Sequence, residues 1–111
     1  MSRRIIQTGI TKEMLSGDNQ PQLQIGDKLY VVDDRKSTYD KMTKIQEDST
    51  LDENEKTNKI FELTLGKDAA KEIADYDLSF KDYINLTYCI MGAITGEDPE
   101  ELKKRAQNSK N

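Results

Sequence analysis

Three carboxylates, Asp75, Asp77 and Asp82, lie close together in the sequence, and clustered carboxylates are the residues that acid–base or metal chemistry would use in this chain. Their spacing places them at expected helix ends, where acidic side chains ordinarily cap helices or face solvent. Nothing in the flanking sequence indicates the burial that a shifted pKa requires. We therefore expect no catalytic site there.

A second oxygen-rich stretch, residues 48–55, has the composition of a calcium-binding loop. An EF-hand loop starting at Asp48 needs glycine at its sixth position and glutamate at its twelfth, whereas the sequence has Glu53 and Lys59 there. A helix start explains the stretch better. We therefore predict no metal site.

The residue types that most often perform catalysis are scarce. The chain has no histidine, which removes Ser-His-Asp and Cys-His catalysis and most zinc sites. Its single cysteine, Cys89, lies in an apolar stretch where a thiol behaves as a small hydrophobic group. A lone cysteine forms no internal disulfide, which fits a reducing cytoplasm. We predict a protein that is not an enzyme and binds no cofactor.

Composition limits the fold and the partners. Of the 111 residues, 34% are hydrophobic and 34% are charged, which indicates one domain with a small core that gains stability by self-association or by a partner. The formal net charge of −4 disfavours general binding to nucleic acid, which requires a basic surface. No run approaches the roughly 18 apolar residues of a membrane span. We expect no membrane or nucleic-acid partner.

The N-terminal third of the chain begins with a polar segment and continues with two short segments typical of β-strands. Residues 1–22 show no sustained hydrophobic period and predict a flexible arm. Leu23–Ile25 and Leu29–Val32 flank the dipeptide Gly26-Asp27, a two-residue turn typical of a β-hairpin. Because an isolated hairpin is marginally stable, we expect its strands to pack on helices or to pair with strands of another subunit.

The first helix after the hairpin is expected to be peripheral. Ser37 and Asp40 form a candidate capping box, with Asp33 or Asp34 as alternative caps, and the helix ends near Asp48. Its apolar stripe consists of three residues at a spacing of three: Tyr39, Met42 and Ile45.

Two further helices follow. Asp52 and Glu55 have the spacing of a capping box, and Gly66 stands where a C-terminal glycine is expected. The predicted buried side of this helix consists of Ile60, Phe61, Leu63 and Leu65. The next helix runs from Lys67 to about Tyr76, and its small apolar groups allow a neighbouring backbone to approach closely.

The most apolar helix is predicted from Ser79, which forms a capping pair with Asp82, to about Ile94, with Gly96 after it. Its apolar positions cover an arc of roughly 220° at 100° per residue. Five residues remain on the opposite side: Lys81, Asp82, Asn85, Cys89 and Gly92. This central helix needs neighbours on several sides. A last, solvated helix starts at Asp98-Pro99.

These elements predict a mainly α protein with a short N-terminal β-hairpin, an α+β bundle of four to five helices around a central apolar helix. We expect a flexible arm over residues 1–22, a single hairpin-plus-helix domain over 23–107 and a disordered tail over 108–111. The tail region is basic, because Lys103, Lys104, Arg105 and Lys110 occur there without an acid.

Candidate contacts with a partner or with a second copy are aromatic and basic. Tyrosine combines a large apolar ring with a polar tip and is enriched at interfaces, although membership of the core rim is the alternative for each one. The candidate contact residues are Tyr30, Tyr39, Phe80, Tyr83, Tyr88, Met91, Lys103, Lys104 and Arg105.

The order of elements and several local sequences resemble a known family. The resemblance covers roughly residues 23–107 and is carried by the hairpin Leu23–Val32, the segment Phe61–Ala70 with its Leu65-Gly66-Lys67-Asp68-Ala69 junction, and Leu78–Tyr83. In these features the chain resembles the tail assembly chaperones of long-tailed phages and prophages of Gram-positive bacteria.

The resemblance implies a protein without catalytic residues that acts in the host cytoplasm and is absent from the mature virion. Its partners would be the tape measure protein, which it keeps soluble, and the tail tube protein, recruited through a longer product made by ribosomal frameshifting. The chain would also form a homo-oligomer. The alternative is a small acidic regulatory protein that binds nucleic acid or another protein.

Overall fold

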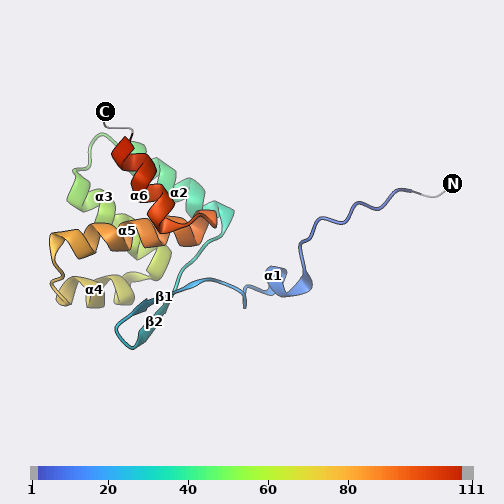
Figure 1. Ribbon diagram of the computed structural model, residues 1–111, viewed down its shortest axis with the longest axis horizontal. Coiled ribbons are helices and arrows are strands. Elements are labelled where there is room, and N and C mark those ends of the chain that lie inside the picture. The colour runs from blue at the N-terminus through green and yellow to red at the C-terminus, as the bar shows by residue number, and fades with distance from the viewer. Residues whose placement is uncertain (1–2, 109–111) are drawn as a thin grey trace.

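The computed structural model describes residues 3–108 and contains a β-hairpin between a short N-terminal helix and five further helices (Figure 1). The elements are α1 (Lys12–Ser16), β1 (Gln22–Ile25), β2 (Lys28–Val31), α2 (Lys36–Glu47), α3 (Glu53–Leu65), α4 (Lys67–Asp75), α5 (Phe80–Thr95) and α6 (Pro99–Asn108). The predicted fold class, mainly helical with an N-terminal hairpin, is confirmed. Of the predicted tail, Asn108 ends α6, and residues 109–111, including Lys110, lie outside the described residues.

The hairpin is a two-stranded antiparallel sheet in which Leu23 faces Tyr30. Gly26 has φ 61°, the positive value that its tight turn needs. Because side chains alternate along a strand, Tyr30 is buried against the helices, whereas Leu29 and Val31 on β2 are exposed. The hairpin therefore has one packed face and one open face.

The helix α2 begins without a side-chain cap, so the caps predicted at Ser37, Asp33 and Asp34 are wrong. Arg35 occupies the N-cap position, and α2 starts at Lys36. The Asp33 carboxylate instead accepts hydrogen bonds from Arg35 Nε at 2.9 Å and Nη2 at 2.8 Å. This ion pair holds the pKa of Asp33 at about 2. The Asp33 side chain therefore binds Arg35 and does not cap α2.

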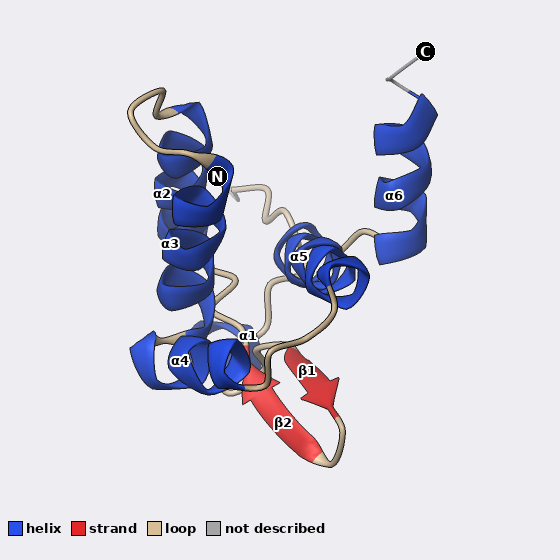
Figure 2. Ribbon diagram, turned by 90° about the vertical axis from the view of Figure 1, so that its left-hand side faces the viewer, coloured by secondary structure: helices blue, strands red, loops and turns tan. Residues whose placement is uncertain are grey.

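The apolar stripe of α2 is thinner than predicted. Met42 is fully buried and Ile45 is half-buried, but Tyr39 is exposed. Thr38 is buried in its place. The helix packs along α3 (Figure 2), and Tyr39 is an aromatic residue on its exposed surface.

The core lies where α3, α4, α5 and the inner face of the hairpin meet. In Figure 2, α2 and α3 stand side by side, α4 crosses their lower end, and α5 lies between this group and α6. The central buried cluster consists of Tyr30, Phe61, Ile73, Leu86 and Ile90. The rings of Phe61 and Tyr83 pack with their centroids 5.1 Å apart, which joins α3 to α5. Leu63 and Leu65, predicted to be buried, are half-buried.

Two predicted helix starts are confirmed in detail. The Asp52 side chain accepts a hydrogen bond from Glu55 N at 2.8 Å, and the reciprocal bond of the capping box is present. Ser79 Oγ accepts one from Asp82 N at 3.1 Å at the start of α5. Gly96 ends α5 with φ 80° in the left-handed region, as expected of a C-terminal glycine.

The N-terminal arm projects away from the helical body (Figure 1), and the chain measures 62 Å along its longest axis. The sequence did not predict the short helix α1 within this arm, which Thr11 caps through a hydrogen bond from Met14 N at 3.2 Å. Residues 3–19 are all exposed.

Candidate interaction surface

The turn between α5 and α6 fixes where the two helices face each other. Gly92 is buried here, which corrects its predicted place on the uncovered side of α5. A Cβ at this position would lie 2.6 Å from the carbonyl oxygen of Glu97 and 3.0 Å from Pro99 Cγ. Asp98 Oδ1 accepts a hydrogen bond from Glu100 N at 2.9 Å in the first turn of α6. The absent side chain at Gly92 thus lets α6 begin against α5.

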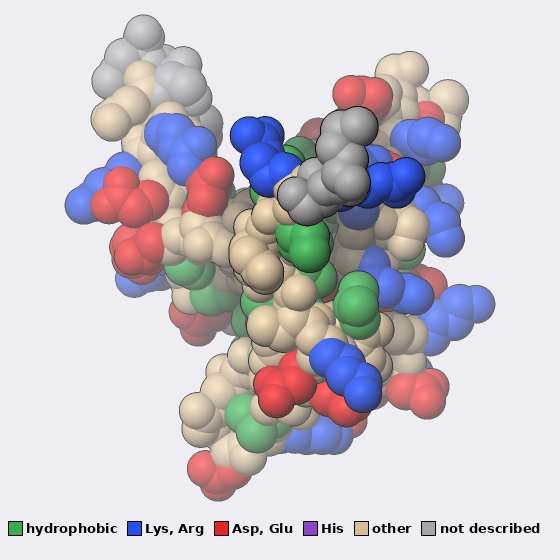
Figure 3. All heavy atoms as spheres, turned by 90° about the vertical axis from the view of Figure 1, so that its right-hand side faces the viewer, with side chains coloured by type: hydrophobic (Ala, Val, Ile, Leu, Met, Phe, Trp, Pro, Cys, Tyr) green, Lys and Arg blue, Asp and Glu red, His purple; other side chains and the backbone are tan. Residues whose placement is uncertain are grey.

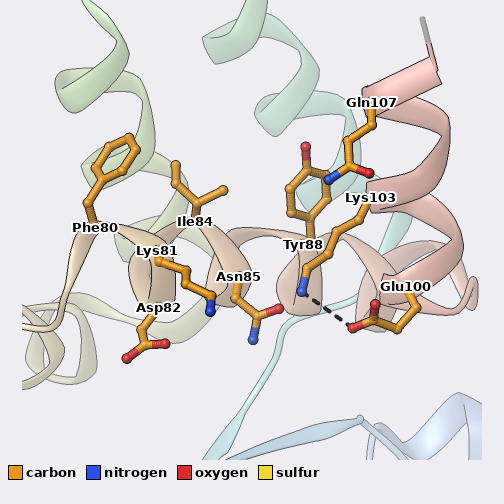
Figure 4. Close-up of a pocket in the computed structure, with 9 residues that line it drawn as sticks. All are labelled: Phe80, Lys81, Asp82, Ile84, Asn85, Tyr88, Glu100, Lys103 and Gln107. Carbon is orange, nitrogen blue, oxygen red and sulfur yellow. Dashed lines mark hydrogen bonds and ion pairs between the residues drawn. The ribbon is translucent and has the colours of Figure 1, made fainter.

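A groove of about 590 Å³ opens between the outer side of α5 and α6 (Figure 4). Its lining combines the N-terminal half of α5 with charged and polar side chains of α6. The lining residues are Phe80, Lys81, Asp82, Ile84, Asn85, Tyr88, Glu100, Lys103 and Gln107.

Apolar groups form one row along this groove. Phe80, Ile84 and Tyr88 are spaced by four residues, which places them on one side of the helix, and Figure 4 shows them projecting from the same side of α5. Phe80 is 79% exposed, Ile84 is exposed and Tyr88 is half-buried. We call these three residues the α5 row. Phe80 is the most exposed of the three.

Charges of both signs surround the α5 row. Lys103 Nζ lies 3.3 Å from Glu100 Oε1, and both belong to α6. Lys81 and Asp82 lie on α5 beside the row (Figure 4). Side chains of opposite charge also alternate over the face seen in Figure 3, with small apolar patches between them. The groove therefore suits an apolar helix face with polar flanks better than a strongly charged polymer.

A second polar feature, the Glu72 cluster, holds the hairpin on α4. Glu72 Oε1 accepts hydrogen bonds from Lys28 Nζ at 2.5 Å, from Tyr30 Oη at 2.5 Å and from Tyr76 Oη at 2.8 Å. The hydroxyls of Tyr30 and Tyr76 lie 2.6 Å apart. We define the Glu72 cluster as these four residues.

Hydrogen bonding shifts the acid–base behaviour of the cluster. The bond from Lys28, and then those from Tyr30 and Tyr76, lower the pKa of Glu72 to about 2. Burial, followed by its bonds to Glu72 and Tyr76, raises the pKa of Tyr30 above its usual value. The bond to Glu72 raises the pKa of Lys28. The cluster joins elements far apart in sequence, and both of its tyrosine hydroxyls are used within it, so we assign it a structural role.

The contact residues predicted from the sequence do not form one surface. The groove brings together Phe80, Tyr88 and Lys103. Tyr30 lies in the core and Tyr39 is exposed on α2, away from the groove. The remaining candidates are Tyr83, which packs on Phe61 and donates to Asn58, half-buried Met91, exposed Lys104, and Arg105, which pairs with Glu97.

Sequence reasoning missed several groove residues. Ile84 lies on the predicted apolar arc but is not among the predicted contacts, although its spacing from Phe80 and Tyr88 places it in the same row. Glu100 and Gln107 belong to the groove because of where α6 lies, and no local pattern shows this.

Catalysis by carboxylates, metal binding and thiol chemistry have little support in the described part of the chain. Asp75, Asp77 and Asp82 are exposed. Within residues 3–108, no three histidine, cysteine, aspartate or glutamate side chains gather closely enough to hold a metal ion. Burial raises the pKa of the Cys89 thiol, which opposes a role as a nucleophile. No helix among these residues is long and apolar enough to cross a membrane.

Comparison with protein families, curated proteins and solved structures found no match to this chain.

Proposed function

We propose that this protein is a tail assembly chaperone of a long-tailed phage or prophage of Gram-positive bacteria, and that it binds the tape measure protein through the α5–α6 groove. The observation that carries the proposal is the α5 row, in which Phe80 is 79% exposed beside Ile84 and Tyr88. A row of apolar side chains at helical spacing, open to solvent and bordered by charges, is the kind of surface that receives an amphipathic helix.

The chemistry of the proposed partner fits this groove. The tape measure protein of such phages is long, helical and largely apolar, and it must stay soluble until tube subunits assemble around it. An apolar face of such a helix would bury Phe80 and Ile84, and the surrounding charges of Lys81 and Glu100 would keep the complex soluble. Residues 3–108 offer no metal cluster and no buried catalytic carboxylate, so binding is the activity that the chain's chemistry supports.

The wider biological role forms part of the same proposal. The protein acts in the host cytoplasm, forms a homo-oligomer and is absent from the mature virion. A longer product of ribosomal frameshifting recruits the tail tube protein to the chaperone-bound tape measure protein.

The alternative of an acidic regulatory protein that binds nucleic acid is less well supported. Lys103 pairs with Glu100, and Arg105 pairs with Glu97, so two of the three basic side chains of α6 are already neutralised within the chain. Nucleic-acid binding through that helix would have to break these pairs. A gel-shift series at low salt tests this alternative, which predicts binding that weakens steeply as salt is added.

Co-expression tests the proposed function. The full chain is expressed together with the tape measure protein encoded nearby, and the soluble fraction of that partner is measured. We expect the chain to raise the soluble yield several-fold, and the double variant F80D/I84D to remove most of this gain, because it places two charges in the apolar row.

Tyr39→Asp is the matched control, since it also introduces a charge at an exposed aromatic residue but lies on α2, outside the groove. Circular dichroism establishes that each variant is folded. If the partner remains insoluble at equal expression of the wild-type chain, the proposed function is wrong. If F80D/I84D and Tyr39→Asp solubilise the partner equally well, the groove is not the binding surface.

A further inference from the structure

The outer edge of β1, the first strand of the hairpin, is open. Val32 N donates to Pro21 O at 2.9 Å, which marks a hydrogen-bonded pair of positions in the hairpin ladder. Because such pairs alternate along an antiparallel ladder, the backbone N–H and C=O groups of Gln22 and Gln24 point away from β2. Within residues 3–108, no residue outside the hairpin forms a hydrogen bond with these groups. The edge can therefore accept a third strand.

A trough of about 260 Å³ lies beside this edge, between β1 and α5, which is the helix above β1 in Figure 2. Its apolar lining consists of Ile25 from β1, Leu78 from the segment before α5, and Leu86 from α5. Its polar lining consists of Gln24, Asp82, Asn85 and Cys89. A strand edge beside a helix is an arrangement that receives an extended segment, whose backbone pairs with the strand and whose alternate side chains enter the trough.

The N-terminal arm contains a segment of suitable chemistry. Ile5 and Ile6 are 82% and 70% exposed, although isoleucine is among the residues most often buried and most favoured in strands. Gly9, with φ 80°, bends the chain directly after residues 5–8. These four residues therefore form a short segment that can pair as a strand and that ends at a bend.

One antiparallel register pairs this segment with the open edge. When Thr8 faces Gln22 and Ile6 faces Gln24, both arm residues meet the backbone groups that point away from β2. Side chains alternate along a strand, so Ile5 then lies on the packed face of the sheet, towards the trough.

The bend at Gly9 distinguishes this register from its neighbour. A shift by one residue would place Gly9 opposite Gln22, inside the paired strand, where the backbone must be extended. The φ of 80° at Gly9 is not an extended value. The register that stops at Thr8 leaves this glycine free to turn the chain.

Charge agrees with the same register. With Ile5 opposite Ile25, Arg3 comes opposite Asp27 in the hairpin turn. Asp27 is exposed and forms no ion pair with any residue from 3 to 108. Arg3 precedes the isoleucines at the position where this acid can receive it.

The path of the arm favours its own chain as the source of the strand. Met14 and Leu15 of α1 line a hollow of about 470 Å³ together with Asp34 and Arg35, so the arm already lies against the base of its own hairpin. Residues 9–21 connect the segment to the start of β1, which is where the end of an antiparallel neighbour must lie. The helix α1 buries no residue, so its position can adjust when the segment pairs.

We propose that residues 5–8 form a strap that closes on β1 of their own chain as an antiparallel third strand, with Ile5 in the trough and Arg3 beside Asp27. Figure 1 shows the open form, in which the arm extends away from the body. The closed strap covers the edge of β1 and excludes strand addition by another chain at that edge. The strap does not depend on the function proposed above.

Amide hydrogen exchange of the dilute full chain, read by NMR for each residue, tests the strap. The N–H groups of Gln22 and Gln24 lack a bond in the open form, so slow exchange at these two positions marks the closed form. We expect both amides to exchange at least tenfold more slowly in the wild type than in Ile5→Asp. Ile10→Asp is the matched control, because it also charges an exposed isoleucine of the arm but lies outside residues 5–8, and it should keep the protection. Equal exchange in the wild type and Ile5→Asp overturns the proposal.

A disulfide tests the register and the source of the strand. In a Cys89→Ser background, the double variant R3C/D27C places two thiols at facing positions of the closed form, within the Cα separation of about 4.4–6.8 Å that a disulfide needs. Mild oxidation of the dilute protein should give an intrachain disulfide, and the control R3C/D34C, whose second cysteine lies beyond β2, should give none. Arg3, Asp27 and Asp34 are all exposed, so these changes leave the core intact.

Two results of the oxidation would overturn the proposal. Disulfides that form between chains at this dilution would assign the strand to a second copy. Equal crosslinking of R3C/D27C and R3C/D34C would show an arm that moves without pairing on β1.

Discussion

Tyr30 Oη donates a hydrogen bond of 2.5 Å to Glu72 Oε1, and this bond ties β2 to α4 across 42 positions of sequence. The same carboxylate oxygen accepts from Lys28 and Tyr76. One ionised side chain therefore adds an anchor to a hairpin that, alone, would be only marginally stable.

Removal of the Glu72 charge should change how stability depends on pH. The pKa of Glu72 falls from its ordinary 4.5 to about 2 in the folded chain. A lowered pKa means that the stabilisation is present above pH 4.5 and is lost as the pH falls towards 2. We expect Glu72→Gln to lower the melting temperature at pH 6 and to reduce its further decline between pH 4.5 and 2.

Thermal melts by circular dichroism at several pH values measure this effect. The comparison of wild type with Glu72→Gln is needed because Asp33, whose pKa is also about 2, loses its charge over the same range. Parallel melting-temperature curves for the two proteins would show that the ionisation of Glu72 does not stabilise the fold.

The two phenylalanines should differ in how much their truncation to alanine destabilises the protein. Phe61 is 2% exposed and packs on Tyr83, so Phe61→Ala should lower the free energy of unfolding by about 3–5 kcal/mol, or leave so small a domain unfolded. Phe80 is 79% exposed, and Phe80→Ala should change it by about 0.5 kcal/mol or less. Urea titrations of both variants provide the measurement. A large loss for Phe80→Ala would mean that this ring is part of the core, not of a binding surface.

Two residues that look like helix caps should also differ. Asp52→Ala removes a complete capping box from α3 and should cost about 1 kcal/mol. Ser37→Ala should have little effect, because the Ser37 side chain is exposed and caps nothing in α2. Chemical denaturation of the pair measures the difference. Equal losses would place a functional cap at Ser37 after all.

The contact at Gly92 leads to a prediction about α6. Alanine favours a helix by about 1 kcal/mol over glycine, yet Gly92→Ala should destabilise the protein, by about 1–3 kcal/mol, because its Cβ would lie 2.6 Å from Glu97 O. Hydrogen exchange should show the loss of protection concentrated in α6. Asn85→Ala, on the exposed side of α5, is the control. A more stable Gly92→Ala would mean that α6 does not pack closely on this turn.

Local chemistry was predictable from the sequence, and long-range contacts were not. Asp52 and Ser79 identified the starts of α3 and α5, because a cap bonds to backbone only three residues away. The start of α2 was missed because Asp33 binds Arg35 instead. The burial of Gly92 depends on the return of α6, which no periodicity within α5 reveals.

The groove shows the same difference between local signals and long-range contacts. The aromatic character of Phe80 and Tyr88 predicts them as contacts, whereas Glu100 and Gln107 belong to the groove only because of the position of α6. The Glu72 cluster is not predictable from the sequence, since it joins β2 to the end of α4 across more than 40 residues. A residue that can form hydrogen bonds does not by itself indicate a partner so distant in the sequence.

The contacts of the hairpin also bear on the order in which the chain is synthesised. Asp33 N donates to Thr64 O at 2.8 Å, and Tyr30 depends on Glu72, so both anchors of the hairpin are translated after it. At about 5–20 residues per second, the interval between Tyr30 and Glu72 is roughly 2–8 s. During that time the hairpin is present without the helices on which it packs. The hairpin therefore lacks both anchors until α3 and α4 have been made.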